Sequence, residues 1–127
     1  MPYVFGYTGV MDITVRGDED RSTRKSFNSF TPVGPLLVTA DEVPDPNDVG
    51  LQLWVNGERR QHGDTKDMIW NIPKLIEYAS HVMTLHPGDL ISTGTPDGVG
   101  PLTAGDEVAI EIERIGRMSV RVETRKR

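Results

Sequence analysis

The sequence predicts a mainly β domain of the α+β class with one substantial helix, and three observations indicate this. Thirteen glycines and nine prolines among 127 residues require many turns, which suits short strands better than long helices. Several segments alternate apolar and polar residues, and Asn56-Gly57 between two of them is the preferred type I′ hairpin turn. Only the segment around residue 75 has helical spacing. At this length we expect one domain over residues 1–127.

The first half of the chain reads as strands separated by polar turns. Residues 7–15 are rich in β-branched side chains and predict a strand, and the polar residues 16–25 predict an exposed loop. A short strand is expected over 36–39, between two Pro-Gly turns. Residues 51–55 predict the first strand of the hairpin.

The second half begins with the predicted helix, over residues 71–83. Asn71 is placed to cap its start, and Pro73 suits its first turn. Its apolar residues fall on one stripe: Ile72, Leu75, Ile76, Ala79, Val82 and Met83. A strand is expected over 88–93, followed by a loop over 94–101.

The chain closes with two predicted strands, each with alternating apolar residues: Val108, Ile110 and Ile112, then Met118, Val120 and Val122.

Composition excludes several classes of function. A net charge of −5 argues against nucleic-acid binding, because no basic surplus is present to neutralise phosphates. The absence of cysteine excludes disulfides and thiol chemistry. No apolar run approaches the roughly 20 residues that cross a bilayer, and no secretory signal is visible. We therefore expect a cytoplasmic protein with no membrane partner.

The glycine-rich loop over 94–101, GTPDGVGP, has no lysine at the position that a phosphate-binding loop requires. It also precedes a strand instead of a helix. Two interpretations remain open: a plain connecting turn, or a tight backbone that offers N–H and O–H donors to an anion such as a carboxylate.

Asp12 stands inside an apolar run, where a carboxylate is costly to bury unless it is paired or bound to a cation. It is either a ligand for a hard cation such as Mg²⁺ or an aspartate on the solvent face of an edge strand. The three histidines have no partner at metal-ligand spacing. Glu111 and Glu113 occupy the polar positions of an amphipathic strand, and we expect them on a solvated face.

Six blocks in order carry a resemblance: GYTGVMDITVR, RKSF, FTPVGP, DEVPDPNDVGLQLWVNGERRQ, TKDMIW and MTLHPGDLISTGTPDGVGP. Together they resemble the fumarylacetoacetate hydrolase family, in its C-terminal catalytic portion, which includes bacterial decarboxylase/isomerase enzymes of aromatic-acid catabolism. The resemblance covers roughly residues 5–122 of the chain.

The resemblance implies a mixed β-sandwich or β-roll, usually dimeric, that holds Mg²⁺ or Mn²⁺. It also implies an acidic 2-oxo or 1,3-dioxo substrate that undergoes C–C hydrolysis, decarboxylation or keto–enol isomerisation. These reactions build negative charge on an enolate oxygen, which a divalent cation stabilises.

The resemblance also assigns residues. Asp12 matches the metal-binding aspartate, and Lys25 matches the catalytic lysine beside the metal and the substrate oxygens. Arg16 matches an arginine near the substrate. Gly94 and Thr95 match the turn that holds the substrate carboxylate.

Two departures from the family pattern matter. Glu19 stands where the family commonly has a glutamine, so the role of that glutamine does not carry over. The family's Glu-x-Glu pair, which precedes the first matched block, is not in this sequence, so we expect a chain truncated at its N-terminus that holds metal weakly and associates with itself. The alternative hypothesis is a non-catalytic chain that binds a partner subunit or a small carboxylate.

Overall fold

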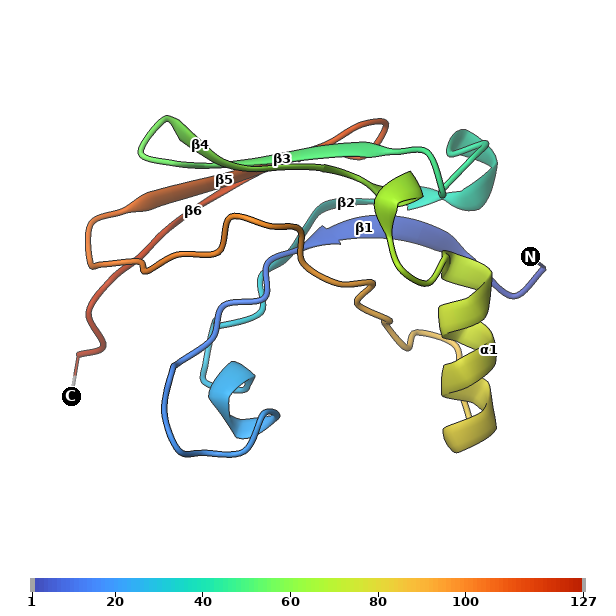
Figure 1. Ribbon diagram of the computed structural model, residues 1–127, viewed down its shortest axis with the longest axis horizontal. Helices are drawn as coiled ribbons and strands as arrows, with labels where there is room; N and C mark the ends of the chain where they lie inside the picture. Colours follow the sequence, from blue (N-terminus) through green and yellow to red (C-terminus); the bar gives the residue numbers. More distant parts are fainter. Residues whose placement is uncertain (1, 127) are drawn as a thin grey trace.

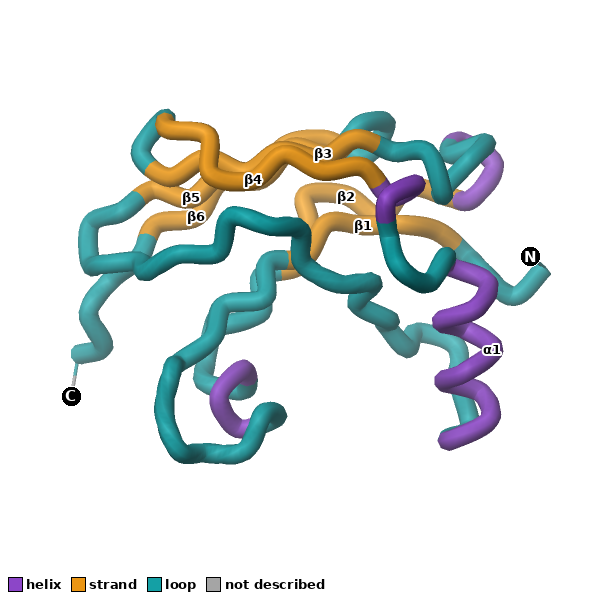
Figure 2. The backbone as a smooth tube through the Cα atoms, viewed as in Figure 1, coloured by secondary structure: helices purple, strands orange, loops and turns teal. Residues whose placement is uncertain are grey.

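The computed structural model describes residues 2–126 as two antiparallel sheets with one helix at the side (Figures 1 and 2). The smaller sheet pairs β1 with β2, and the larger one has the strand order β4-β3-β5-β6. The strands are β1 (Gly6–Val10), β2 (Val33–Thr39), β3 (Gly50–Val55), β4 (Glu58–Asp64), β5 (Glu107–Ile112) and β6 (Gly116–Arg121). The mainly β prediction is confirmed.

The remaining elements are helical. The only α-helix of residues 2–126 is α1 (Ile72–Val82), and three short 3₁₀ helices are η1 (Thr23–Lys25), η2 (Ala40–Glu42) and η3 (Thr65–Asp67). In Figure 1, α1 and the loop that contains η1 project from the same side of the two sheets. No helix in this part of the chain has the length and apolarity that a membrane crossing requires.

The predicted hairpin is confirmed, because β3 and β4 pair with Val55 opposite Glu58. Asn56 and Gly57 between them both have positive φ, of 51° and 80°, as a type I′ turn requires. Strand β5 lies on the other side of β3, and β6 closes the sheet, so the two predicted closing strands are also confirmed.

The core lies between the inner face of the larger sheet and the end of β1. Its buried cluster consists of Met11, Val55, Val108 and Ile110. Val108 and Ile110 alternate along β5 and therefore point to the same face. Burial of each such side chain contributes about 1.5–3 kcal/mol, and this packing fixes the backbone next to Asp12.

Helix α1 begins as predicted, since the Asn71 side chain accepts a hydrogen bond from the Lys74 N–H at 3.0 Å. Its apolar stripe is buried at the start, half-buried in the middle and exposed at the end. Ile72 is 8% exposed, whereas Val82 is 63% and Met83 is 57% exposed. The last turn of α1 therefore presents apolar surface to solvent.

Two predicted boundaries and one predicted strand differ from the structure. The first strand ends at Val10, although the N–H groups of Met11 and Ile13 still donate to backbone carbonyls across from them. β2 begins at Val33 and is longer than the predicted strand. The predicted strand over 88–93 is wrong, because no neighbouring strand pairs with it within residues 2–126.

Candidate functional site

The structure brings together two of the five candidate site residues, Asp12 and Lys25. The Lys25 ammonium donates to Asp12 Oδ2 at 2.5 Å, although 13 positions separate the two residues. Both side chains are partly exposed, at 40% for Lys25 and 34% for Asp12. The pair is therefore an ion pair that a ligand from solvent can reach.

The fold positions each partner separately. Asp12 directly follows Met11, whose side chain is buried in the core and whose N–H donates to the Pro32 carbonyl at 3.1 Å. Lys25 ends η1, and its carbonyl accepts a hydrogen bond from the Thr31 hydroxyl at 3.1 Å. The backbone on both sides of the ion pair is thus held by other contacts.

Thr14 is a member of this cluster that the sequence reasoning missed. Its hydroxyl lies 3.3 Å from the Lys25 ammonium and 3.5 Å from Asp12 Oδ1. Residues two apart in extended backbone point to the same face, so the spacing of Asp12 and Thr14 was the available signal.

Asp20 organises the loop that carries Lys25. Its Oδ1 accepts from the N–H groups of Ser22 and Thr23, both at 3.0 Å, and its Oδ2 accepts from the Thr23 hydroxyl. These hydrogen bonds, above all the one from the Thr23 hydroxyl, stabilise the charged form and hold the pKa of the Asp20 carboxyl below its ordinary value. The carboxylate therefore acts as a structural acceptor at the start of η1.

Arg16 and Glu19 lie in the exposed part of the same loop, and neither makes a side-chain hydrogen bond or ion pair within residues 2–126. Arg24 is different, because its Nε is buried without a hydrogen-bond partner. A buried guanidinium nitrogen without a partner is costly. Arg24, beside Lys25, is thus a further cation at this loop that the sequence reasoning did not single out.

Gly94 and Thr95 lie on a separate, exposed loop, and the φ of Gly94 is 118°. The loop is attached to β4 rather than to the Asp12 cluster. Pro96 accepts a hydrogen bond from Gln61 Nε2 at 3.5 Å, and a Cβ on Gly98 would overlap the Arg60 carbonyl oxygen. In the described part of the chain, no hydrogen bond joins Thr95 to Asp12 or Lys25.

The donor set around Asp12 does not by itself fit a divalent cation. Mg²⁺ is held by several oxygen ligands in octahedral geometry, and its affinity rises with the number of charged ligands. Asp12 is the one carboxylate in contact with Lys25, and residues 2–126 contain no group of three or more His, Asp or Glu side chains placed to share a metal ion. A complete site needs ligands from elsewhere.

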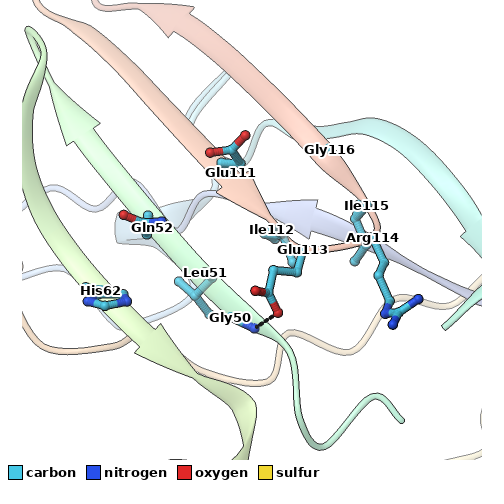
Figure 3. Close-up of a pocket in the computed structure, with 10 residues that line it drawn as sticks. All are labelled: Gly50, Leu51, Gln52, His62, Glu111, Ile112, Glu113, Arg114, Ile115 and Gly116. Atoms are coloured by element: carbon cyan, nitrogen blue, oxygen red, sulfur yellow. Dashed lines mark hydrogen bonds between the residues drawn. The ribbon is translucent and has the colours of Figure 1, made fainter. Parts of the chain in front are cut away.

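A hollow of about 580 Å³ lies elsewhere, on the larger sheet (Figure 3). His62, Gln52 and Glu111 follow one another across β4, β3 and β5 at its floor. Glu113, at its edge, accepts a hydrogen bond from the Gly50 N–H at 2.9 Å. Glu111 and Glu113 are exposed, as predicted, and none of the five candidate residues lines this hollow.

Sequence comparison relates the chain to known enzymes. The family profile described as Fumarylacetoacetate (FAA) hydrolase C-terminal matches residues 1–123. A maleylpyruvate hydrolase of Aquipseudomonas alcaligenes is 51% identical over 122 residues, which cover 96% of this chain and 42% of that protein. A 4-hydroxyphenylacetate degradation bifunctional isomerase/decarboxylase of Escherichia coli is 42% identical over 127 residues, which cover 96% of this chain and 30% of that protein.

Solved structures give the same result. The maleylpyruvate hydrolase from Sphingobium sp. SYK-6 in complex with manganese(II) ion and pyruvate superposes with a TM-score of 0.89 at 49% identity, over 94% of this chain and 44% of that chain. A fumarylacetoacetate hydrolase from psychrophilic Exiguobacterium antarcticum superposes with a TM-score of 0.89 at 39% identity, over 98% of this chain and 48% of that chain. The chain thus spans less than half the length of each of these four relatives.

Proposed function

Because the chain belongs to the fumarylacetoacetate hydrolase family, we propose that it carries part of the active site of a divalent-metal-dependent enzyme. The substrate we propose is an acidic 2-oxo or 1,3-dioxo compound, which undergoes C–C bond hydrolysis, decarboxylation or keto–enol isomerisation. The observation that supports this best is the Asp12–Lys25 pair, a carboxylate and an ammonium at 2.5 Å that solvent can reach.

Lys25 has the chemistry that these reactions require. Each of them builds negative charge on a carbonyl oxygen as an enolate forms, and a fixed ammonium beside that oxygen stabilises the charge. The Thr14 hydroxyl and Asp12 hold the ammonium from one side. Lys25 is therefore the proposed catalytic residue.

Arg16, Gly94 and Thr95 are the proposed substrate-binding residues. Arg16 offers a planar cation that suits a carboxylate, and its side chain is not engaged by another residue of the described chain. The backbone N–H groups around Gly94 and the Thr95 hydroxyl are donors on an exposed loop. In this proposal the substrate carboxylate contacts both the loop that contains Arg16 and the loop that contains Gly94 and Thr95.

The metal we propose is Mg²⁺ or Mn²⁺, and a relative was crystallised with manganese(II) and pyruvate. Asp12 is the proposed ligand from this chain. The further charged ligands come from polypeptide outside residues 2–126 or from a second chain, because the described residues offer no group of three donors. Without them we expect weak retention of the metal.

The test is turnover of an acylpyruvate with Mg²⁺ or Mn²⁺ by the wild-type protein and by Lys25→Ala. We expect the substitution to lower kcat by at least about 100-fold, the scale of one lost oxyanion-stabilising donor. Lys74→Ala is the matched control, since Lys74 also pairs with a carboxylate, that of Glu77 at 2.9 Å. Equal rates for wild type and Lys25→Ala would contradict the role of Lys25.

A second candidate function is a non-catalytic chain that binds a partner subunit or a small carboxylate. The incomplete donor set around Asp12 favours it. The two proposals differ in one measurement, because a non-catalytic chain binds pyruvate without turning over any acylpyruvate, whatever metal is added.

We also propose that the protein associates with itself, as a homodimer or a larger assembly. The support is exposed apolar surface: Trp70 is 44%, Tyr78 is 58% and Val82 is 63% exposed along α1 and the segment before it. Light scattering at increasing concentration is expected to give a mass above 14.1 kDa, the mass of one chain. Val82→Gln is expected to lower that mass, and a wild-type monomer at high concentration would contradict the proposal.

A further inference from the structure

We propose that Asp20 is a positioning residue for Lys25, because its carboxylate orders the backbone from which the Lys25 ammonium reaches Asp12. This inference rests on the proposed catalytic role of Lys25, but its main readout does not require turnover. It identifies the residue that determines where the lysine side chain begins.

The start of η1 depends on Asp20. This helix has only three residues, and a helix so short needs contacts beyond its own hydrogen bonds. Ser22, at its N-cap position, makes no side-chain hydrogen bond that caps it. Asp20 supplies the cap instead: Oδ1 accepts from the N–H groups of Ser22 and Thr23 at 3.0 Å, and Oδ2 accepts from the Thr23 hydroxyl.

The peptide unit between Ser22 and Thr23 connects this cap to Lys25. Its N–H, that of Thr23, donates to Asp20 Oδ1, and its carbonyl, that of Ser22, accepts from the Lys25 N–H at 3.2 Å. Because a peptide unit is planar, a fixed N–H also fixes the direction of the carbonyl. The Asp20 carboxylate thus orients the group to which the backbone of Lys25 is hydrogen-bonded.

The end of η1 has separate anchors. The Val15 N–H donates to the Arg24 carbonyl at 3.0 Å, and the Thr31 hydroxyl donates to the Lys25 carbonyl at 3.1 Å. Loss of the Asp20 carboxylate is therefore expected to loosen the first turn of η1 without detaching the loop.

The ammonium of Lys25 responds to such loosening because its stem is long and flexible. The ammonium contacts Asp12 Oδ2 at 2.5 Å and the Thr14 hydroxyl at 3.3 Å. Each of these contacts orders a side chain that gains rotamer freedom when it is released. A backbone that no longer holds Lys25 in one orientation therefore weakens both contacts.

The experiment uses the whole ¹⁵N-labelled protein without substrate. Asp20→Ala removes three hydrogen bonds, and we expect the Ser22 and Thr23 amides to exchange with water at least about tenfold faster than in wild type. We also expect the side-chain signal of the Lys25 ammonium to broaden. The Lys74 ammonium, which pairs with Glu77 at 2.9 Å on α1, is the internal control and is expected to keep its signal.

Two further variants isolate the effect. Asp20→Asn keeps one acceptor oxygen for the two N–H groups and is expected to fall between wild type and Asp20→Ala. Asp64→Ala removes a comparable cap from η3, where Asp64 accepts from the Lys66 N–H at 2.9 Å, and is expected to leave the Lys25 signal unchanged. Figure 1 shows η3 beside the start of α1, away from the loop that contains η1. Circular dichroism and urea unfolding show that each variant keeps the fold.

Turnover of the acylpyruvate gives the consequence for catalysis. We expect Asp20→Ala to lower kcat at least about tenfold, because a misplacement of about 1 Å costs up to about 100-fold in rate. KM is expected to change less than about twofold, since Lys25 is proposed to act on charge that develops in the transition state. Asp64→Ala is expected to keep the wild-type kcat.

The proposal is overturned if the Ser22 and Thr23 amides exchange faster in Asp20→Ala while the Lys25 signal stays as in wild type, because Asp20 then has a local structural role alone. A Lys25 signal that broadens equally in Asp64→Ala, or an unchanged kcat of Asp20→Ala in an active protein, also overturns it. Failure of the proposed function is seen separately, as absent turnover in a wild-type protein whose Lys25 signal responds to Asp20 as described.

Discussion

The Thr14 hydroxyl lies 3.3 Å from the Lys25 ammonium, so a short polar side chain two residues after Asp12 helps to fix where the lysine points. This contact joins the segment that follows β1 to the 3₁₀ helix η1. It is also the part of the cluster that is least exposed, because it is partly buried while the Lys25–Asp12 contact is exposed.

Thr14→Val is therefore expected to loosen Lys25 without unfolding the protein. The valine keeps the shape of the side chain and removes the acceptor for the ammonium. The measurement is the ¹⁵N-detected side-chain signal of Lys25. We expect this signal to be sharp in wild type and broad in the variant, because the released ammonium exchanges its protons with water faster. Thr124→Val, at an exposed position, is the control, and an unchanged Lys25 signal in Thr14→Val would contradict the contact.

Asn71→Ala is expected to lower the free energy of unfolding by about 1 kcal/mol, the usual cost of an N-cap. The reason is that the Lys74 N–H loses its acceptor at the start of α1. Urea unfolding measures the change, with Ser80→Ala in the same helix as the control, because the Ser80 hydroxyl donates only to the Glu77 carbonyl within the helix and accepts from no N–H group at the helix start. A loss no larger than that of the control would show that the cap contributes little.

Met11→Ala is expected to lower the free energy of unfolding by about 2–5 kcal/mol, because it leaves a cavity where a 3%-exposed side chain packed against the larger sheet. Leu36→Ala, at a position that is 63% exposed, is expected to change stability by less than about 0.5 kcal/mol. Thermal unfolding of both variants tests this, and similar losses would contradict the placement of the core.

The hydrogen-bonded carboxylate of Asp106 is expected to make the free energy of unfolding depend on pH. Hydrogen bonds from the Thr103 N–H and the Asn56 amide hold the pKa of Asp106 below its ordinary value. The carboxylate therefore adds stability above the unfolded-state pKa, near 3.9, and this contribution is lost as the pH falls through the lower folded-state pKa.

The matching measurement compares wild type with Asp106→Asn by urea unfolding between about pH 6 and pH 2.5. We expect wild type to lose more stability than the variant as the pH falls below about 4. Asp97→Asn, an exposed position without a hydrogen bond in the described chain, is the control. Parallel pH profiles for wild type and Asp106→Asn would rule out this contribution.

Local sequence patterns predicted the elements whose hydrogen bonds join residues close together in the sequence. The hairpin turn at Asn56-Gly57 and the cap at Asn71 need only a few neighbouring residues, and both occur as expected. The segment 88–93 has a strand-like composition but pairs with no strand of residues 2–126, and Leu90 is 67% exposed. A strand needs a partner, and composition does not say whether one is present.

The candidate site was predictable only in part. The residue types came from the resemblance, and periodicity could not have joined Asp12 to Lys25, because they are 13 positions apart in sequence and most of the segment between them is irregular. Thr14 was accessible through its alternation with Asp12. The hydrogen bond from the Gly50 N–H to Glu113 could not be predicted, because the sequence pattern places Glu113 among the polar residues of a solvated face.

We expect the Asp12–Lys25 loop and the Gly94–Thr95 loop to bind one acidic ligand together. The most direct test is a titration of the ¹⁵N-labelled protein with pyruvate in the presence of Mg²⁺, followed by backbone amide shifts. We predict saturable shifts at Asp12, Arg16, Lys25 and Thr95 with a common dissociation constant. Shifts confined to the hollow around His62 and Glu111, or different constants for the two loops, would contradict the account.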